Sequence, residues 1–404
     1  MDRFQGLLGI VVILGFAILI STNRKRINWR TMGVGLALQV AFALLVLKWE
    51  PGFQALRWTA DQIQKLIDYT AEGTSFVFGS LTGDDAGFIF ALNVLPVIIF
   101  LGAIIAALFH LRILQRFVDV VGAGIGKLMG TSKVESVWAS TVIFLGQTEA
   151  PLVVGPWIPK LTRSELFTCM AGGFASVAGS TLIGYSMLGA PLPYLLAASI
   201  MNAPGSLLIA KALIPETEKS IASANVRDIR DTENKNVIDA LGSGAITGGR
   251  IAVTVAALLI AFIALIAMLS ALIGGIGNIF GQDGWSLEGI IGFVLAPVAW
   301  LIGVPWEEAS MVGNFIGQKT VLNEFVGYTA FSEHVDDLSP KAILISTFAL
   351  AGFANLSSIA IQIGAFGALA PERRAEVAEL GPKALLAGSM TNMLNAAIVG
   401  VIAL

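Results

Sequence analysis

Two short polar clusters interrupt long apolar stretches of this chain. Gly-Gln-Thr-Glu-Ala-Pro at 146–151 places an amide, a hydroxyl and a carboxylate side by side, and Asn323-Glu324 stands in a similar apolar setting. Burying such groups costs free energy unless a partner satisfies them. The side chains could hydrogen-bond a polar ligand, and the carboxylates Glu149 and Glu324 could also act as an acid and base pair.

Structural roles could also explain these residues. Residues 147–149 could cap a half-helix that begins at Ala150, because carboxylates are favoured at helix N-termini. Glu324 could form an ion pair with Lys319. A further carboxylate, Glu135, is expected to be solvated near a membrane edge.

The composition indicates a polytopic membrane protein. Of 404 residues, 55% are hydrophobic and 13% are charged, whereas soluble domains carry about 25% charged residues. The net charge of −3 and the lack of a basic patch argue against nucleic-acid binding, which needs clustered Lys and Arg. The single cysteine, Cys169, cannot form an internal disulfide and is expected to pack in the interior.

Apolar runs of about 20 residues, long enough to cross a bilayer, recur along the chain and predict eight transmembrane helices. The segment 53–80 alternates apolar and charged residues, which favours an amphipathic helix at the membrane interface. The eight predicted spans are 6–22, 31–48, 87–109, 165–189, 192–214, 250–275, 341–370 and 383–404.

Positive charges in short loops predict the orientation, because Lys and Arg favour the cytoplasmic side. Arg24-Lys25-Arg26 places the first loop in the cytoplasm and the N-terminus outside. The first span has neither a basic start nor a small-residue cleavage site, so we expect it to be retained. The polar segment 215–249 becomes a cytoplasmic linker.

Two apolar regions are too short for two crossings and carry similar charges at both ends. Residues 132–162 and 305–332 are each predicted to form a re-entrant hairpin, with the two polar clusters at the hairpin tips. Non-helical backbone at membrane depth is tolerated only where it is buried in protein or lines a wet cavity. The two tips therefore predict a binding site between them.

The two halves of the chain repeat one another. Gly-Phe-Ala-Ser at 173–176 matches Gly-Phe-Ala-Asn at 352–355, and 195–202 matches 385–392 with five identities in eight. Gly and Ser residues near both first matches predict broken helices. Each repeat has three crossings and a hairpin, so the copies must be inverted, as in secondary transporters. The predicted division is 1–86 (two spans and the interfacial helix), 87–214 (first repeat), 215–249 (linker) and 250–404 (second repeat).

The motifs at 146–151, at 323–326 (Asn-Glu-Phe-Val) and at 352–355, followed by Ser358, resemble those of the concentrative nucleoside transporters. The resemblance covers roughly residues 30–404 and points to the shorter bacterial form, in the inner membrane. It implies a homotrimer in which an elevator-type transport domain carries a nucleoside past a fixed scaffold, with a coupling cation and no other cofactor.

The resemblance also implies roles for individual residues. Gln147, Thr148 and Glu149 match positions that hold the nucleobase, and Glu324, Asn355 and Ser358 match positions that hold the ribose hydroxyls. Phe353 matches an aromatic residue at the ribose side and Thr181 a residue facing the base, although plain packing would also explain both. The chemistry agrees, because a carboxylate accepts strong hydrogen bonds from two vicinal hydroxyls.

The coupling ion is less clearly implied. In sodium-coupled members an asparagine five residues before the tip glutamine binds sodium, and here that position is Val142, whereas the hydroxyl ligand is retained as Ser176. A valine cannot ligate sodium, which favours proton coupling and leaves sodium possible. Glu149 or Glu324 could then carry the proton, since burial disfavours the charged carboxylate.

We expect a cation-coupled nucleoside symporter and no enzymatic activity. An intramembrane enzyme that uses Glu149 and Glu324 is the first alternative, but it would need a nucleophile, metal cluster or cofactor motif that the sequence lacks. A channel is the second alternative, which would conduct a solute without concentrating it.

Overall fold

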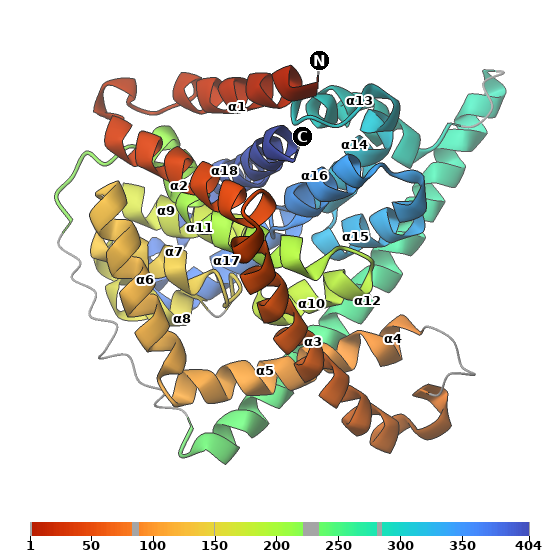
Figure 1. The fold of residues 1–404 in the computed structure, drawn as a ribbon, viewed down its shortest axis with the longest axis horizontal. Helices are drawn as coiled ribbons and strands as arrows, with labels where there is room; N and C mark the ends of the chain where they lie inside the picture. Colours follow the sequence, from red (N-terminus) through yellow and green to blue (C-terminus); the bar gives the residue numbers. More distant parts are fainter. Residues whose placement is uncertain (1, 83–88, 149, 221–233, 281–284, 404) are drawn as a thin grey trace.

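A computed structural model describes residues 2–82, 89–148, 150–220, 234–280 and 285–403. Every regular element in these residues is a helix (Figure 1). The N-terminal part contains α1 (Asp2–Leu19), α2 (Trp29–Leu47) and α3 (Glu50–Phe78). Asn28 caps α2 by accepting from two backbone N–H groups, and α3 is the amphipathic helix predicted at 53–80.

The first repeat begins with three helices, the first of them a single turn, and continues into a hairpin, a broken helix and a long helix. Its hairpin consists of α7 (Lys133–Thr141), α8 (Ala150–Val154) and the 3₁₀ turn Gly155–Lys160. The other helices are α4 (Phe90–Asn93), α5 (Leu95–His110), α6 (Ile113–Met129), α9 (Arg163–Ala175), α10 (Gly179–Met187) and α11 (Leu192–Leu213).

The second repeat has the same order of elements. The hairpin of α14 (Trp306–Val321) and α15 (Glu324–Glu333) follows two helices, and a broken helix and a long helix come after it. The remaining helices are α12 (Val237–Ile279), α13 (Leu287–Leu301), α16 (Pro340–Leu350), α17 (Leu356–Leu369) and α18 (Arg374–Ile402). Figure 1 shows α12 running along one side of the molecule, where it packs against α5.

Six helices or helix pairs in the described residues are long and apolar enough to cross a membrane. They correspond to six of the eight predicted spans. The other two are built from shorter helices: the apolar part of α1 covers Gln5–Leu19, and the predicted span 341–370 is divided into α16 and α17. The break in that span is the one that the repeat motif predicted, and α9 and α10 are separated by an equivalent break after Ala175.

Three features differ from the sequence-based expectation. Helices α6 and α13 were not predicted, because α6 mixes charged with apolar residues and α13, with 15 residues, is shorter than the roughly 20 residues of a membrane span. A sharp bend of 114° separates α13 from α14, so α13 is not a continuation of the hairpin. Helix α12 starts at Val237, which assigns the end of the predicted linker 215–249 to a helix.

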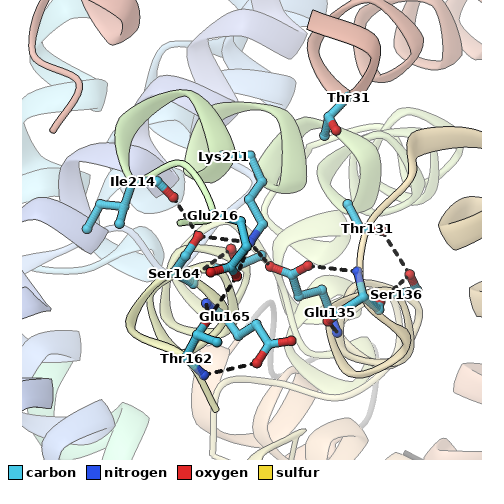
Figure 2. Close-up of polar contacts among 12 residues, drawn as sticks. Thr31, Thr131, Glu135, Ser136, Thr162, Ser164, Glu165, Lys211, Ile214 and Glu216 are labelled. Atoms are coloured by element: carbon cyan, nitrogen blue, oxygen red, sulfur yellow. Dashed lines mark hydrogen bonds and ion pairs between the residues drawn. The ribbon is translucent and has the colours of Figure 1, made fainter. Parts of the chain in front are cut away.

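A buried ionic cluster anchors the base of the first hairpin (Figure 2). Lys211 of α11 forms an ion pair with Glu135 of α7, donates to Ser164 Oγ at 2.8 Å and lies 3.3 Å from a carboxylate oxygen of Glu216. Glu135 also closes a capping box with Ser132 at the start of α7. The expectation that Glu135 is solvated is wrong: it is 2% exposed, because Lys211 satisfies its charge.

Candidate functional site

The tip of the first hairpin and the breaks of the two broken helices lie against one another. The Gly179 N–H, at the start of α10, donates to the Phe144 carbonyl oxygen in the hairpin tip at 2.9 Å. The Phe353 N–H, in the break between α16 and α17, donates to the Ser176 carbonyl oxygen in the other break at 3.0 Å. Backbone groups that no helix satisfies are thus paired with one another, the first pair within the first repeat and the second between the two repeats, as burial requires.

Glu324 is the first residue of α15 at the tip of the second hairpin. Asn323 caps this helix by accepting from the Val326 N–H at 3.0 Å, and a carboxylate is favoured beside a helix N-terminus. Glu324 is 5% exposed, and each of its oxygens accepts one protein hydrogen bond. Tyr185 Oη donates to Oε1 at 3.1 Å, and Asn355 Nδ2 donates to Oε2 at 2.9 Å.

Asn355 connects the second hairpin tip to the broken helix behind it. It is the N-cap of α17, where its Oδ1 accepts from the Ser358 N–H at 2.9 Å and from the Ser357 hydroxyl at 2.8 Å. Because these bonds hold Oδ1, the amide Nδ2 must point the other way, toward Glu324. The cap therefore fixes the orientation of the amide.

Gln147 connects the first hairpin tip to the same helix. Its Nε2 donates to Ser358 Oγ at 2.7 Å, and its Oε1 accepts from Gln362 Nε2 at 3.3 Å. Gln147 is 3% exposed, so its polar groups are satisfied by side chains from the other repeat rather than by solvent. These bonds, together with those of Asn355, bring Gln147, Ser358, Asn355 and Glu324 into one chain of contacts.

The remaining predicted site residues have varied environments. Thr148 is exposed, Phe353 is half-buried, and Thr181 is buried on α10 with its hydroxyl donating to the Ala178 carbonyl at 2.9 Å. Thr181 lies one turn before Tyr185 and so on the same helix face. Glu149 lies outside the described residues.

Lys319 does not form the hydrogen-bonded ion pair with Glu324 that the sequence suggested, and its ammonium group bonds elsewhere. Lys319 Nζ donates to the Ala349 carbonyl and to Asn392 Oδ1, both at 2.8 Å. Gln147, in turn, directs its side-chain amide to Ser358 and Gln362. The cap and ion-pair interpretations therefore leave the contacts of Gln147 and Glu324 unexplained.

Two asparagines that the sequence alignment of the repeats paired with each other meet in the structure. Asn392 Nδ2 lies 3.1 Å from Asn202 Oδ1 and donates to the Ala175 and Ala351 carbonyls at 3.0 and 2.9 Å. Asn202 Nδ2 also donates to Ala351 O at 3.0 Å. The pair thus satisfies carbonyls at both helix breaks. Only glycine fits at 352, because a Cβ there would lie 2.2 Å from Asn392 Oδ1.

Sequence reasoning missed Tyr185, Gln362 and Asn392 as parts of this site. Tyr185 had a usable signal, since it lies four residues after Thr181 and a buried tyrosine hydroxyl needs a partner. Gln362 had one as well, because it is an amide within an apolar helix. Asn392 ended the repeat alignment, but the alignment alone does not place it at a helix break.

The residues expected to bear on a cation are both buried. Val142 is apolar and 1% exposed, and Ser176 is 0% exposed with its hydroxyl donating to the Gly173 carbonyl at 2.9 Å. Val142 supplies no side-chain oxygen. Ser176 retains lone pairs on its hydroxyl and carbonyl oxygens, although the carbonyl already accepts from Phe353.

The sequence matches known protein families along most of its length. Family models described as Na+ dependent nucleoside transporter, N-terminus and C-terminus, match residues 8–81 and 194–400, and one described as nucleoside recognition (Gate) matches 91–192. The putative nucleoside permease NupX of Escherichia coli is 44% identical, covering 99% of each chain, and the nucleoside permease NupC of Helicobacter pylori is 41% identical, covering 97% of this chain and 96% of its own.

Solved structures agree over the same length. CNTnw in an inward-facing substrate-bound state is 46% identical, with a TM-score of 0.95 over 99% of this chain and 98% of that chain. These matches confirm the helical fold class with its inverted repeats, and they make the protein a transporter rather than an enzyme. The chain belongs to the Na+-dependent nucleoside transporter family, whose members include the concentrative nucleoside transporters.

Proposed function

We propose that this protein is a symporter that imports nucleosides across the bacterial inner membrane, with protons as the coupling ions. The observation that supports this most is the chain of hydrogen bonds from Gln147 through Ser358 and Asn355 to Glu324. It joins residues from both hairpin tips and one broken helix that were expected to hold the two halves of a nucleoside.

The geometry of Glu324 suits a ribose. A carboxylate has about four lone-pair directions, and the two protein donors to Glu324 use one on each oxygen. The lone pairs that these two side chains leave can accept from two vicinal hydroxyls. Gln147, with Thr148 and Glu149 on the same tip, would then hold the base, and Phe353 and Thr181 would border the ligand.

The proton is favoured over sodium because of Val142 and Ser176. Sodium needs several oxygen ligands, and the buried Val142 side chain offers none where sodium-coupled members have an asparagine. Glu149 and Glu324 are the carboxyl groups that could carry the proton. Ser176 would complete a sodium site only if another oxygen replaced the missing amide.

The assembly and movement belong to the same proposal. The chain would form a homotrimer, with the N-terminus outside and the segment 215–249 on the cytoplasmic side, as the positive loops indicate. Its hairpins and broken helices would move as an elevator-type transport domain. Solved relatives in inward-facing and outward-facing states support this movement.

Uridine uptake into proteoliposomes tests the function and the coupling ion. We expect radiolabelled uridine to accumulate above its external concentration under an inward pH gradient and to ignore a sodium gradient. Accumulation would exclude a channel, and recovery of unchanged uridine would exclude conversion. Uptake that followed sodium alone would contradict proton coupling.

A matched variant sharpens the test. Val142→Asn restores the amide oxygen of the sodium-coupled members beside the retained Ser176. We expect this variant to gain a sodium dependence that the parent lacks. If neither protein accumulated uridine under any gradient while both bound it, the symport mechanism would be refuted.

A further inference from the structure

Gln362 is a buried amide that lies behind the first hairpin tip. It belongs to α17, is 0% exposed, and its Nε2 donates to two acceptors: the Met170 carbonyl oxygen at 3.1 Å and Gln147 Oε1 at 3.3 Å. Among the described residues its own Oε1 has no hydrogen-bond donor. The side chain thus makes its bonds through one end, toward α9 and the tip.

These contacts fix which end of each amide faces which partner. A backbone carbonyl can only accept, so the atom of Gln362 that faces Met170 must be the NH2 group. The same NH2 group faces Gln147, so Gln147 must turn its oxygen toward Gln362. Its own NH2 group then faces Ser358, which accepts at 2.7 Å. The network, read from the carbonyl outward, leaves no freedom to exchange the oxygen and nitrogen of Gln147.

The slot that holds Gln362 is closely fitted. Gly173 lies three residues after Met170 on the same face of α9, and a Cβ added there would lie 2.8 Å from Gln362 Nε2 and 3.4 Å from the Gln147 Cβ. The absence of a side chain at 173 therefore allows Gln362 to reach both acceptors. A methyl group at this position would displace the amide that orients Gln147.

We propose that Gln362 is a positioning residue that sets the hydrogen-bond polarity of Gln147, and thereby makes the transporter select nucleobases with a carbonyl oxygen at the position that Gln147 contacts. The proposal rests on the proposed function, in which Gln147 contacts the base. With its oxygen held by Gln362 and one N–H donated to Ser358, Gln147 has its second N–H for the base. An N–H group binds a carbonyl oxygen and is mismatched against an amino group or a weak acceptor.

Thio-substituted uridines test this selection directly. In 2-thiouridine and 4-thiouridine a sulfur, which is a poor acceptor, replaces one carbonyl oxygen. We expect the parent protein to bind one of the two about 3- to 10-fold more weakly than uridine, the range of one neutral hydrogen bond. Equal affinity for all three ligands would overturn the proposal.

The variants Gln362→Met and Gly173→Ala then separate positioning from stability. Each should reduce the thio penalty to less than about twofold, because a freed Gln147 side chain no longer holds its NH2 group against the base, so uridine loses the same hydrogen bond that sulfur weakens. Neither should change the ratio of uridine to 2′-deoxyuridine affinity, which depends on Glu324. A merely structural role would weaken all ligands together, and retention of the full thio penalty in both variants would refute the assignment.

Two controls complete the experiment. Gln318→Met removes a buried amide of α14 whose partner among the described residues is Asn314 Oδ1 of the same helix, at 3.1 Å, and it should keep the parent's thio penalty. Gln147→Ala should abolish the penalty. If Gln147→Ala left both the uridine affinity and the thio penalty unchanged, the proposed contact between Gln147 and the base would be refuted. If Gln147→Ala changed them and Gln362→Met did not, only the positioning role of Gln362 would be refuted.

Discussion

The substitution Glu324→Gln tests the ribose assignment with a change of very few atoms. An amide has nearly the shape of a carboxylate, and the site can accept it in one orientation. Asn355 Nδ2 can only donate and its Oδ1 is held by the helix cap, so the new amide oxygen must face Asn355. The new NH2 group would face Tyr185, whose hydroxyl can accept as well as donate. We therefore expect the variant to fold.

The expected loss of affinity follows from the bonds that remain for the ligand. A hydrogen bond to a charged group contributes about 1.5 to 3 kcal/mol and a neutral one about 0.5 to 1.5 kcal/mol. Losing the charge from two ribose bonds at Glu324 should therefore cost about 2 to 3 kcal/mol. That corresponds to roughly a 30- to 140-fold rise in the Kd of uridine.

Binding calorimetry with uridine, 2′,3′-dideoxyuridine and uracil measures this effect. Dideoxyuridine and uracil lack the hydroxyl pair, so their affinities should change less than about threefold, since neither can make the charged bonds. Glu307→Gln removes a charge from an exposed residue of α14 and should leave all three ligands unaffected. An equal loss for uridine and uracil would refute the placement of the ribose at Glu324.

The ionic cluster and the helix break give two stability predictions. Lys211→Met leaves Glu135 buried without its partner and should lower the free energy of unfolding by about 3 to 5 kcal/mol. Thermal unfolding in detergent measures this loss. Adding Glu135→Gln to the same protein should recover most of it, and no recovery would contradict the pairing. Gly352→Ala should lower the free energy of unfolding by about 1 to 3 kcal/mol, because the added Cβ meets Asn392 Oδ1. Asn392→Ala should then destabilise the Gly352→Ala protein less than it destabilises the parent. Equal destabilisation in both proteins would contradict the clash.

Long apolar runs and short motifs determined much of this protein in advance. The re-entrant hairpins, the breaks in both broken helices and the repeat followed from the sequence, because a polar or helix-breaking residue within an apolar run has few places to go in a membrane. Helices α6 and α13 did not follow, since α6 mixes charged with apolar residues and α13 is shorter than a membrane span. The early start of α12 was missed because the residues before 250 are too polar to suggest a span.

Only the tertiary structure decided which polar groups satisfy one another. Types and spacing identified Gln147, Asn355 and Glu324 as buried polar residues, but hydrogen bonds between side chains over 200 residues apart, such as Gln147 to Ser358, depend on how the repeats pack. The same is true of Glu135, whose burial is tolerable because Lys211 of another helix reaches it. A sequence shows that a buried polar group needs a partner, and the fold determines which partner lies within hydrogen-bonding distance.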